Sequence, residues 1–520
     1  MNTTVSVSRC ANCPLNRRGF LLRGGAAAGG ALALATPRWL GAAEPAAKTR
    51  VRIIYALHAA QQPGPDWPNQ GFDFRPVMER INSTLARECA GFEFVPSLAS
   101  GEEQANKLLE EDLAAGNIDG YLVYQMNAWN RVIQPVAASG KPVVYADFQY
   151  GGSGGLLVYT AALLRSGATN VGFVSSSDPA DLVRAVECLR GAGQGGGGGV
   201  GAAAAGARRR STPAPGSPAV TADPCACLAA GECLERLGKA KLLVVRDQTA
   251  GAEGAIAGIT VERIPFSALN DAWAAADKDA SRAVADRWQQ GARKVEGVSR
   301  ETLEASAAMY LGMKSLLEKH RATGITINCL GGFYGGHIHA YPCLGFHELN
   351  NEGLIGGCEA DVRSAATMLI GTTLTQGRPG YISDPVIDTS KRQIIYAHCV
   401  ASNRVFGPKG AANPFEILTH SEDRQGAAVR SILPTGYLTT TLEFDQGRKQ
   451  VLMHRAVAVG NDPDDRACRT KLCAEPVGDL EKLFAEWDQW GWHRVTFYGD
   501  LKEPVGALAD ALGWQVVEEA

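Results

Sequence analysis

The sequence predicts an α/β protein with two parallel-sheet domains followed by a β-rich, barrel-like domain. Short apolar runs alternate with amphipathic helical stretches from residue 50 to about residue 378, which is typical of parallel strands covered by helices. After Pro379 the texture changes to alternating strands and turns, as in 393–400 and 439–444. These two textures in one chain indicate a three-part layout.

The first α/β domain is expected to span residues 50–190. Ser100 and Glu103 form a capping box for a helix, and Gly116 is placed to close it. The strands expected in this domain are 51–57, 121–124, 143–146 and 171–174. Their regular alternation with helices indicates a Rossmann-like sheet.

Residues 191–219 are expected to be a low-complexity linker. The polyglycine run, the alanine run and the Pro/Ser-rich tail provide no apolar face to bury. Arg208, Arg209 and Arg210 are expected to be a solvated charge run. We therefore predict that the segment is dispensable.

A second Rossmann-like domain is expected over residues 220–378, and a β-rich domain with terminal helices over 379–520. The second domain contains a long helical stretch at 301–320, with Leu303, Ala307 and Leu311 on its buried side. Its expected strands are 242–245, 259–264 and 325–330.

Residues 1–43 indicate export. The run 16–22, Asn-Arg-Arg-Gly-Phe-Leu-Leu, resembles a twin-arginine signal, and a weakly apolar stretch and Ala43 follow it. We expect a periplasmic or otherwise extracytoplasmic protein that meets the twin-arginine translocase already folded. The net charge of −3 is close to neutral, so no nucleic-acid partner is expected.

The turn 356–361, Gly-Gly-Cys-Glu-Ala-Asp, is the most informative stretch because it joins an apolar run to a helix. In an open α/β layer, ligands bind at the carboxyl ends of strands. Glu359 and Asp361 are suited there to holding a hard divalent cation that organises sugar hydroxyls. The alternative is that Asp361 only caps the helix, since Asp is a favourable N-cap residue.

Two segments together resemble the L-fucose isomerase family and its L-arabinose isomerase relatives. They are residues 343–361 and Trp490-Gly491-Trp492-His493 with Gly499. The resemblance is strongest after residue 300, and it implies the three-part fold described above and a homo-oligomer.

The resemblance also implies a divalent metal, Mn²⁺ or Mg²⁺, held by two carboxylates and one histidine. Asp361 matches the family's aspartate ligand and His493 its histidine ligand. The remaining ligand is a glutamate that doubles as the catalytic base. Its position falls near Phe346, with Glu348 offset beside it, so Glu348 is the expected third ligand.

The family's reaction is aldose–ketose isomerisation through an enediol, which needs a base beside the carbonyl and a metal that bridges both oxygens. Glu359 is the first candidate for the base and Glu348 the second, with Asp361 completing the catalytic set. The expected ligand is a monosaccharide or small glycan. Two alternatives stay open: a glycoside hydrolase-type enzyme that uses the same pocket and paired carboxylates, or a non-catalytic sugar-binding protein.

Four further residues are candidates for substrate contacts. Trp129 lies in a predicted loop and is able to stack on a sugar ring. Three histidines have polar or strand-end positions from which they can reach a sugar: His337, His398 and His420. Each also has an ordinary structural reading, as a packing residue or a polar loop residue.

Overall fold

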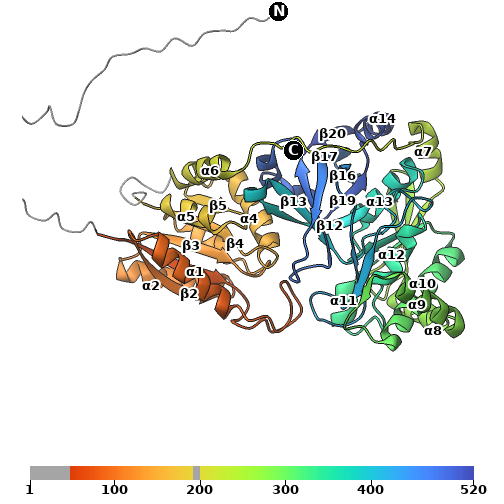
Figure 1. Ribbon diagram of the computed structural model, residues 1–520, viewed down its shortest axis with the longest axis horizontal. Helices are drawn as coiled ribbons and strands as arrows, with labels where there is room; N and C mark the ends of the chain where they lie inside the picture. The colour runs from red at the N-terminus through yellow and green to blue at the C-terminus, as the bar shows by residue number, and fades with distance from the viewer. Residues whose placement is uncertain (1–46, 191–198) are drawn as a thin grey trace, which may run out of the picture. The chain divides into compact units, whose positions relative to one another are not determined.

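The computed structural model describes residues 47–190 and 199–520 (Figure 1). The first sheet has five strands in the order β2-β1-β3-β4-β5, and every neighbouring pair is parallel. The strands are β1 (Thr49–Ala56), β2 (Phe92–Ala99), β3 (Gly120–Gln125), β4 (Val143–Asp147) and β5 (Val171–Val174). The expected parallel first sheet is confirmed.

Helices follow each strand of this sheet, as a parallel topology requires. They are α1 (Arg75–Glu88), α2 (Glu102–Ala115), α3 (Ile133–Ala138), α4 (Ser153–Arg165) and α5 (Pro179–Glu187). Gly116 ends α2 in the left-handed conformation, at φ 64°. Strands β4 and β5 are buried along their whole length because helices cover both faces of the sheet.

The expected low-complexity linker at 191–219 needs correction. Residues 191–198 lie outside the described part of the chain, but Val200–Ser211 forms helix α6, which packs against β5. Arg208 is not solvated. Its guanidinium is buried, pairs with Glu481 at 2.6 Å and lies 3.6 Å from the ring centroid of Phe173. The alanines that give the segment its low complexity also let α6 pack closely against β5.

The second sheet has the strand order β11-β10-β6-β8-β7, and only β7 runs antiparallel to its neighbour. The strands are β6 (Lys241–Val245), β7 (Gly251–Ile256), β8 (Ile259–Arg263), β10 (Gly324–Ile327) and β11 (Ile355–Cys358). The surrounding helices are α7 (Ala230–Leu237), α8 (Phe266–Ala274), α9 (Lys278–Gly291), α10 (Arg300–His320), α11 (Cys329–Tyr334), α12 (Cys343–Asn351) and α13 (Val362–Leu374). Gly356 lets β11 lie directly on α12, because a Cβ there would come within 2.6 Å of the backbone of Phe346.

The C-terminal region contains a closed barrel of six strands, which confirms the barrel-like expectation. The order is β16-β19-β12-β13-β18-β17, and β16 pairs with β17 to close it. The strands are β12 (Tyr381–Asp388), β13 (Gln393–His398), β16 (Leu438–Asp445), β17 (Gln450–Asn461), β18 (Thr470–Pro476) and β19 (Arg494–Tyr498). Closure leaves the barrel without free edges.

Smaller elements surround the barrel. Strand β20 (Gln515–Glu518) adds to β17 in parallel and follows the terminal helix α14 (Lys502–Leu512). Two short 3₁₀ segments, Leu480–Phe484 and Trp487–Trp490, precede β19. A separate small sheet contains β9 (Lys294–Val295), β14 (Phe415–Leu418) and β15 (Ala428–Ser431).

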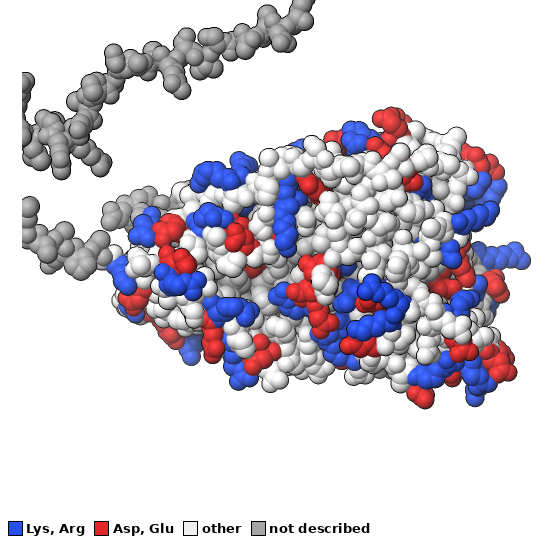
Figure 2. Space-filling model, viewed as in Figure 1, with Lys and Arg blue, Asp and Glu red and all other residues white. Residues whose placement is uncertain are grey.

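Among the described helices, none combines the length and apolar character needed to cross a membrane. On the face that Figure 2 shows, Lys and Arg side chains are interspersed with Asp and Glu, and neither sign forms a continuous patch. That face therefore does not have the single-sign field typical of nucleic-acid binding.

Candidate active site

The turn after β11 places two carboxylates at the carboxyl edge of the second sheet. Glu359 and Ala360 both adopt the left-handed conformation, at φ 63° and 51°. The Ala360 N–H donates to the carbonyl of Ile327 on β10, which fixes the turn against the neighbouring strand. Asp361 then begins α13 as its N-cap, accepting from the Ser364 N–H at 3.0 Å. Asp361 therefore does cap the helix, as the alternative interpretation expected.

Three strands of the barrel place polar side chains opposite this turn. Asp384 lies on β12, and its register partner on β13 is Ala397, the residue before His398. On the other side of β12, Ser383 is opposite Arg494, which follows His493. The register thus brings Asp384, His398 and His493 to one end of the barrel.

These side chains converge on His493. Its Nε2 lies 3.5 Å from Oε2 of Glu359 and 3.3 Å from Oδ1 of Asp384, and its Nδ1 lies 3.0 Å from Oδ2 of Asp361. Nε2 of His398 lies 3.8 Å from Oε1 of Glu359. One ligand atom each from Glu359, His398 and His493 lies within 4.8 Å of the others. The five residues Glu359, Asp361, Asp384, His398 and His493 are called the carboxylate–histidine cluster below.

Hydrogen bonds give the two histidines different roles. Nδ1 of His493 faces the Asp361 carboxylate and carries a proton there, so a cation that displaces the second ring proton would bind at Nε2. Nδ1 of His398 accepts from the N–H of Cys399 at 3.0 Å, so the proton of the neutral ring is on Nε2. Both Nε2 atoms are buried without a hydrogen-bond partner. His398 thus offers a donor to whatever occupies the space between them, and His493 offers either a proton or, once that proton is displaced, a ligand for a cation.

The cluster favours positive charge at its centre. Burial lowers the pKa of His493, but Glu359, Asp361 and Asp384 outweigh it and hold this pKa well above its usual value. Burial raises the pKa of Glu359 to about 8, against the opposing effect of His493. Burial also raises the pKa of Asp361, but its hydrogen bond from His493 and that from Ser364 hold it well below its usual range. A proton or a cation beside His493 is therefore stabilised from three sides.

A pocket of about 200 Å³ leads to the cluster, and the first α/β region contributes to its wall. Trp67 comes from the loop after β1 and Trp129 from the loop after β3, so the carboxyl edge of the first sheet faces the pocket. Trp129 is 52% exposed and meets Trp492 edge-on, with ring centroids 5.6 Å apart. Gly154 at the start of α4 gives Trp492 room, because a Cβ there would lie 3.2 Å from the indole.

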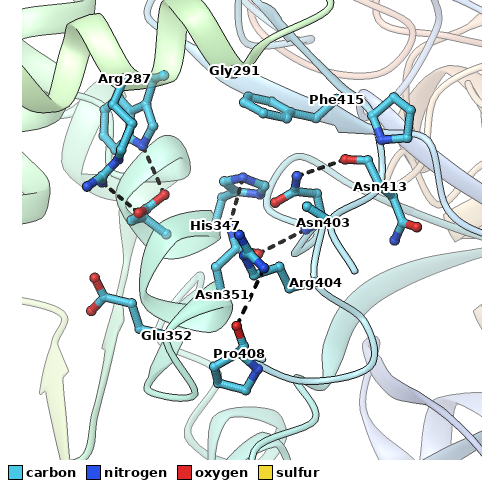
Figure 3. Close-up of a pocket in the computed structure, with 14 residues that line it drawn as sticks. Arg287, Gly291, His347, Asn351, Glu352, Asn403, Arg404, Pro408, Asn413 and Phe415 are labelled. Atoms are coloured by element: carbon cyan, nitrogen blue, oxygen red, sulfur yellow. Dashed lines mark hydrogen bonds and ion pairs between the residues drawn. The ribbon is translucent and has the colours of Figure 1, made fainter. Parts of the chain in front are cut away.

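Glu348 does not point into this pocket, so its expected role as third ligand and second base needs correction. Its carboxylate accepts from Arg287 Nη2 at 2.6 Å and from Trp288 Nε1 at 3.0 Å. Glu348 lines a different pocket, of about 830 Å³. Arg287, His347 and Asn403 line the same pocket (Figure 3). The sequence offset of Glu348 from the expected ligand position puts it on the face of α12 that packs against α9.

Of the other predicted contact residues, some lie at the pocket and some do not. Trp129 lines the pocket and His398 belongs to the cluster. His420 is buried near them and lies 3.4 Å from Asp423, and its neighbour Glu422 is the residue that lines the pocket. His337 is exposed and stacks on Phe266 of α8, with centroids 5.6 Å apart, so it does not line the pocket.

Asp384 is the residue that the sequence reasoning missed. It lies in Tyr-Ile-Ser-Asp-Pro-Val-Ile-Asp, which reads as an apolar strand. A carboxylate in the interior of a buried strand is costly unless it is paired, and this is the signal that singles it out. Asp66 and Glu422 also line the pocket and were not singled out, whereas Trp492 lies in the segment that carries the family resemblance.

Comparison with known proteins gives distant matches. No protein-family model matches the chain. The sulfoquinovose isomerase of Clostridium sp. (strain MSTE9) is 25% identical over 269 residues, covering 49% of this chain and 57% of that protein. The sulfoquinovose isomerases of Priestia aryabhattai and Priestia megaterium (strain ATCC 12872 / QMB1551) are each 24% identical over 225 residues, covering 41% of this chain and 48% of each relative. Sugar isomerases are among its distant relatives. The chain spans about half the length of the curated relatives it matches.

Solved structures match only weakly. An ABC transporter solute binding protein from Burkholderia multivorans aligns with 10% identity and a TM-score of 0.17, over 56% of this chain and 85% of that one. A solute binding protein from Bacillus halodurans C-125 with bound myo-inositol gives 11% identity and a TM-score of 0.17, over 57% and 82%. Likenesses this low carry no argument about fold or function.

Proposed function

We propose that this protein is a metal-dependent aldose–ketose isomerase of monosaccharides, with an L-fucose isomerase-like arrangement. The observation that carries the proposal is the convergence of Glu359 and Asp384 on His493 Nε2, at 3.5 and 3.3 Å. The distant likeness to sulfoquinovose isomerases supports the same reaction class.

The donor set fits a divalent cation. Glu359, Asp384 and His493 offer two carboxylates and one imidazole, and Asp361 holds the imidazole in the tautomer that leaves Nε2 free to bind. Carboxylate–histidine–metal pairs of this kind fix the orientation of the ligand. Oxygen-rich ligation with one imidazole suits Mn²⁺ or Mg²⁺. When bound, such an ion supplies positive charge beside the carbonyl oxygen of the sugar.

The remaining steps fall to side chains of the chain itself. Glu359 removes the proton from the carbon beside the carbonyl and returns it to the neighbouring carbon, because its carboxylate is held at the inner end of the pocket. The Nε2–H of His398 donates to a substrate oxygen as negative charge develops there. Trp129 and Trp492 form the apolar side of the pocket and exclude water from one face of the sugar. The small volume suits a monosaccharide better than a glycan chain.

Export through the twin-arginine route is part of the proposal. It rests on Arg17-Arg18 and the small-residue site at Ala43. Replacing both arginines with lysine is expected to leave the precursor in the cytoplasm, and cell fractionation measures this. Unchanged export of the double variant would refute the route.

The reaction is tested with the mature protein by metal analysis, followed by incubation of sugars in heavy water. We expect one divalent cation per chain and deuterium at the carbon beside the carbonyl. His493→Ala should lose the metal. Glu359→Gln should lose deuterium incorporation, and Glu348→Gln serves as the matched control because its carboxylate lies in another pocket.

The outcomes separate the alternatives. Release of monosaccharide from a glycan, without deuterium incorporation, would make the protein a hydrolase. Sugar binding with neither reaction would make it a receptor. Loss of deuterium incorporation in Glu348→Gln but not in Glu359→Gln would move the chemistry away from the carboxylate–histidine cluster.

A further inference from the structure

Four carboxylates face the pocket, and among the described residues no lysine or arginine lines it. The acids are Asp66, Glu359, Asp384 and Glu422. A bound divalent cation would offset only two of these four formal charges. Sulfonates, phosphates and carboxylates are normally recognised by Arg or Lys through charge-assisted hydrogen bonds. The pocket therefore lacks the groups that an anionic sugar requires.

Asp66 and Glu422 line the pocket from two loops outside the carboxylate–histidine cluster. Asp66 belongs to the loop after β1, and its Oδ2 lies 2.9 Å from Nε2 of His58. Glu422 belongs to the loop after β14, and its Oε2 accepts from the Tyr334 hydroxyl at 2.7 Å. The N–H of Gln70 donates to the carbonyl of Glu422, which ties the two loops together. Two elements far apart in the sequence are thus held with one carboxylate each on the same pocket.

The two acids carry a mutual electrostatic cost. Burial is the largest of the effects that raise the pKa of Glu422 to about 7; His420 and the Tyr334 hydroxyl oppose it, and the charge of Asp66 adds to it. No lysine or arginine among the described residues forms a salt bridge with either acid. A cationic group between them would relieve this repulsion.

Aromatic rings line the same pocket. They are Trp67, Trp129 and Trp492, and Trp129 is half exposed. Tryptophan faces attract cations as well as sugar C–H groups. Acidic and aromatic walls together are the usual means by which proteins bind ammonium groups.

We propose that the substrate is a sugar with a cationic amino group, which Asp66 and Glu422 recognise in the same pocket as the carboxylate–histidine cluster. Calling this ligand a substrate rests on the proposed isomerisation, whereas the inference itself concerns the charge of the sugar that the pocket binds. That sugar differs from the sulfonated sugar for which the sulfoquinovose isomerases are named. Asp66 and Glu422 are thereby assigned as specificity-determining residues.

The test compares sugars that differ only in charge. Glucosamine, galactosamine and mannosamine, their N-acetyl derivatives, the neutral parent hexoses and sulfoquinovose are titrated against the metal-loaded protein by calorimetry. At least one amino sugar is expected to bind about tenfold more tightly than its neutral parent, since a unit charge pair at the pocket mouth is worth on the order of a factor of ten. High salt should reduce the preference.

Isosteric variants assign the preference to residues. Asp66→Asn and Glu422→Gln are each expected to remove most of the difference between amino sugar and N-acetyl sugar. Glu110→Gln, which neutralises an exposed acid on α2, should leave the difference unchanged. Equal affinity for charged and neutral forms, or tighter binding of sulfoquinovose, would overturn the inference.

Deuterium incorporation separates this inference from the proposed function. Selective binding of an amino sugar without deuterium incorporation would sink the isomerase reaction and leave the charge selection standing. Deuterium incorporation into sulfoquinovose or neutral sugars alone would sustain the isomerase and refute the selection. Absence of binding to every sugar would refute both.

Discussion

Glu519 holds together a buried network behind the candidate active site, and its substitution gives the sharpest test of the packing. Its carboxylate accepts a hydrogen bond from Arg494 Nη2 at 2.8 Å, and its other oxygen lies 2.8 Å from His454 Nδ1. Arg494 in turn donates to the carbonyl of His493 at 2.9 Å. The change Glu519→Gln keeps the shape of the side chain and removes its charge, so it leaves a buried guanidinium without its counter-ion.

Two routes give the magnitude. Breaking a buried ion pair from one side costs about 3–5 kcal/mol. Independently, Arg494 and His454 outweigh the effect of burial and lower the pKa of Glu519 to about 2. Since each pKa unit corresponds to about 1.4 kcal/mol, a displacement from the usual 4.5 corresponds to about 3 kcal/mol at neutral pH. The two routes agree on about 3–4 kcal/mol.

The assay is thermal unfolding of the protein at pH 7. A unit of about 470 residues has an unfolding entropy of about 1 kcal/mol per kelvin, so Glu519→Gln should lower Tm by about 3–4 °C. The neighbouring Glu518 is the matched control. It forms a surface pair with Lys502 at 2.6 Å, and such pairs contribute about 0–1 kcal/mol, so Glu518→Gln should change Tm by no more than about 1 °C.

The pH dependence gives an independent check on the same network. The pKa of Glu519 is lower in the folded chain than in the unfolded chain, so its contribution is complete above about pH 4.5 and is lost as pH falls toward 2. The gap in Tm between wild type and Glu519→Gln should therefore close over this range. Equal effects of the Glu518 and Glu519 variants, or a gap that widens in acid, would refute the reasoning.

Two further changes probe the site. Asp361→Asn should keep the helix cap, since Asn caps about as well as Asp, but its amide N–H₂ would face His493 Nδ1 and shift the ring proton to Nε2. Calorimetric titration should then show metal affinity lower by about 10–100-fold, with Tm nearly unchanged. Unchanged metal affinity would contradict the assignment of the Nδ1 proton. Gly154→Val should displace Trp492, whose indole lies 3.2 Å from the position of the new Cβ, and should weaken sugar binding with a change in tryptophan fluorescence. Gly506→Ala on α14, where a Cβ has open space, is the control, and equal behaviour of the two variants would contradict the packing argument.

Much of the fold is predictable from local patterns. The strands of both parallel sheets are short apolar runs, and burial on both faces makes such runs easy to recognise. Asp361 and His493, 132 positions apart in the chain, are brought within 3.0 Å of each other, but Asp361 faces Nδ1 and so supports the histidine instead of lying beside Nε2 as the metal ligand that the family resemblance implied. A turn that follows a strand and carries two acids is a local signal, which is why it was visible in the sequence.

Other features depend on partners that no local pattern names. Helix α6 was read as a linker because its low-complexity sequence hides the packing of Arg208 against Phe173 and Glu481, which lie far away in sequence. Glu348 was read as a ligand because its distance from the motif was small, whereas the direction of its side chain is set by Arg287 and Trp288 on α9. Tertiary partners decide such cases.

The left-handed backbone at Glu359 and Ala360 puts folding stability and catalytic activity in conflict. L-residues without a short polar side chain lose about 1–2 kcal/mol in this conformation, and glycine does not. Laboratory evolution for heat resistance alone should therefore select glycine at position 360. The same substitution would make the backbone that orients the Glu359 carboxylate more flexible, so the more heat-stable variants should have lower activity. Sequence drift at this one alanine would then report which of the two properties a lineage has been selected to keep.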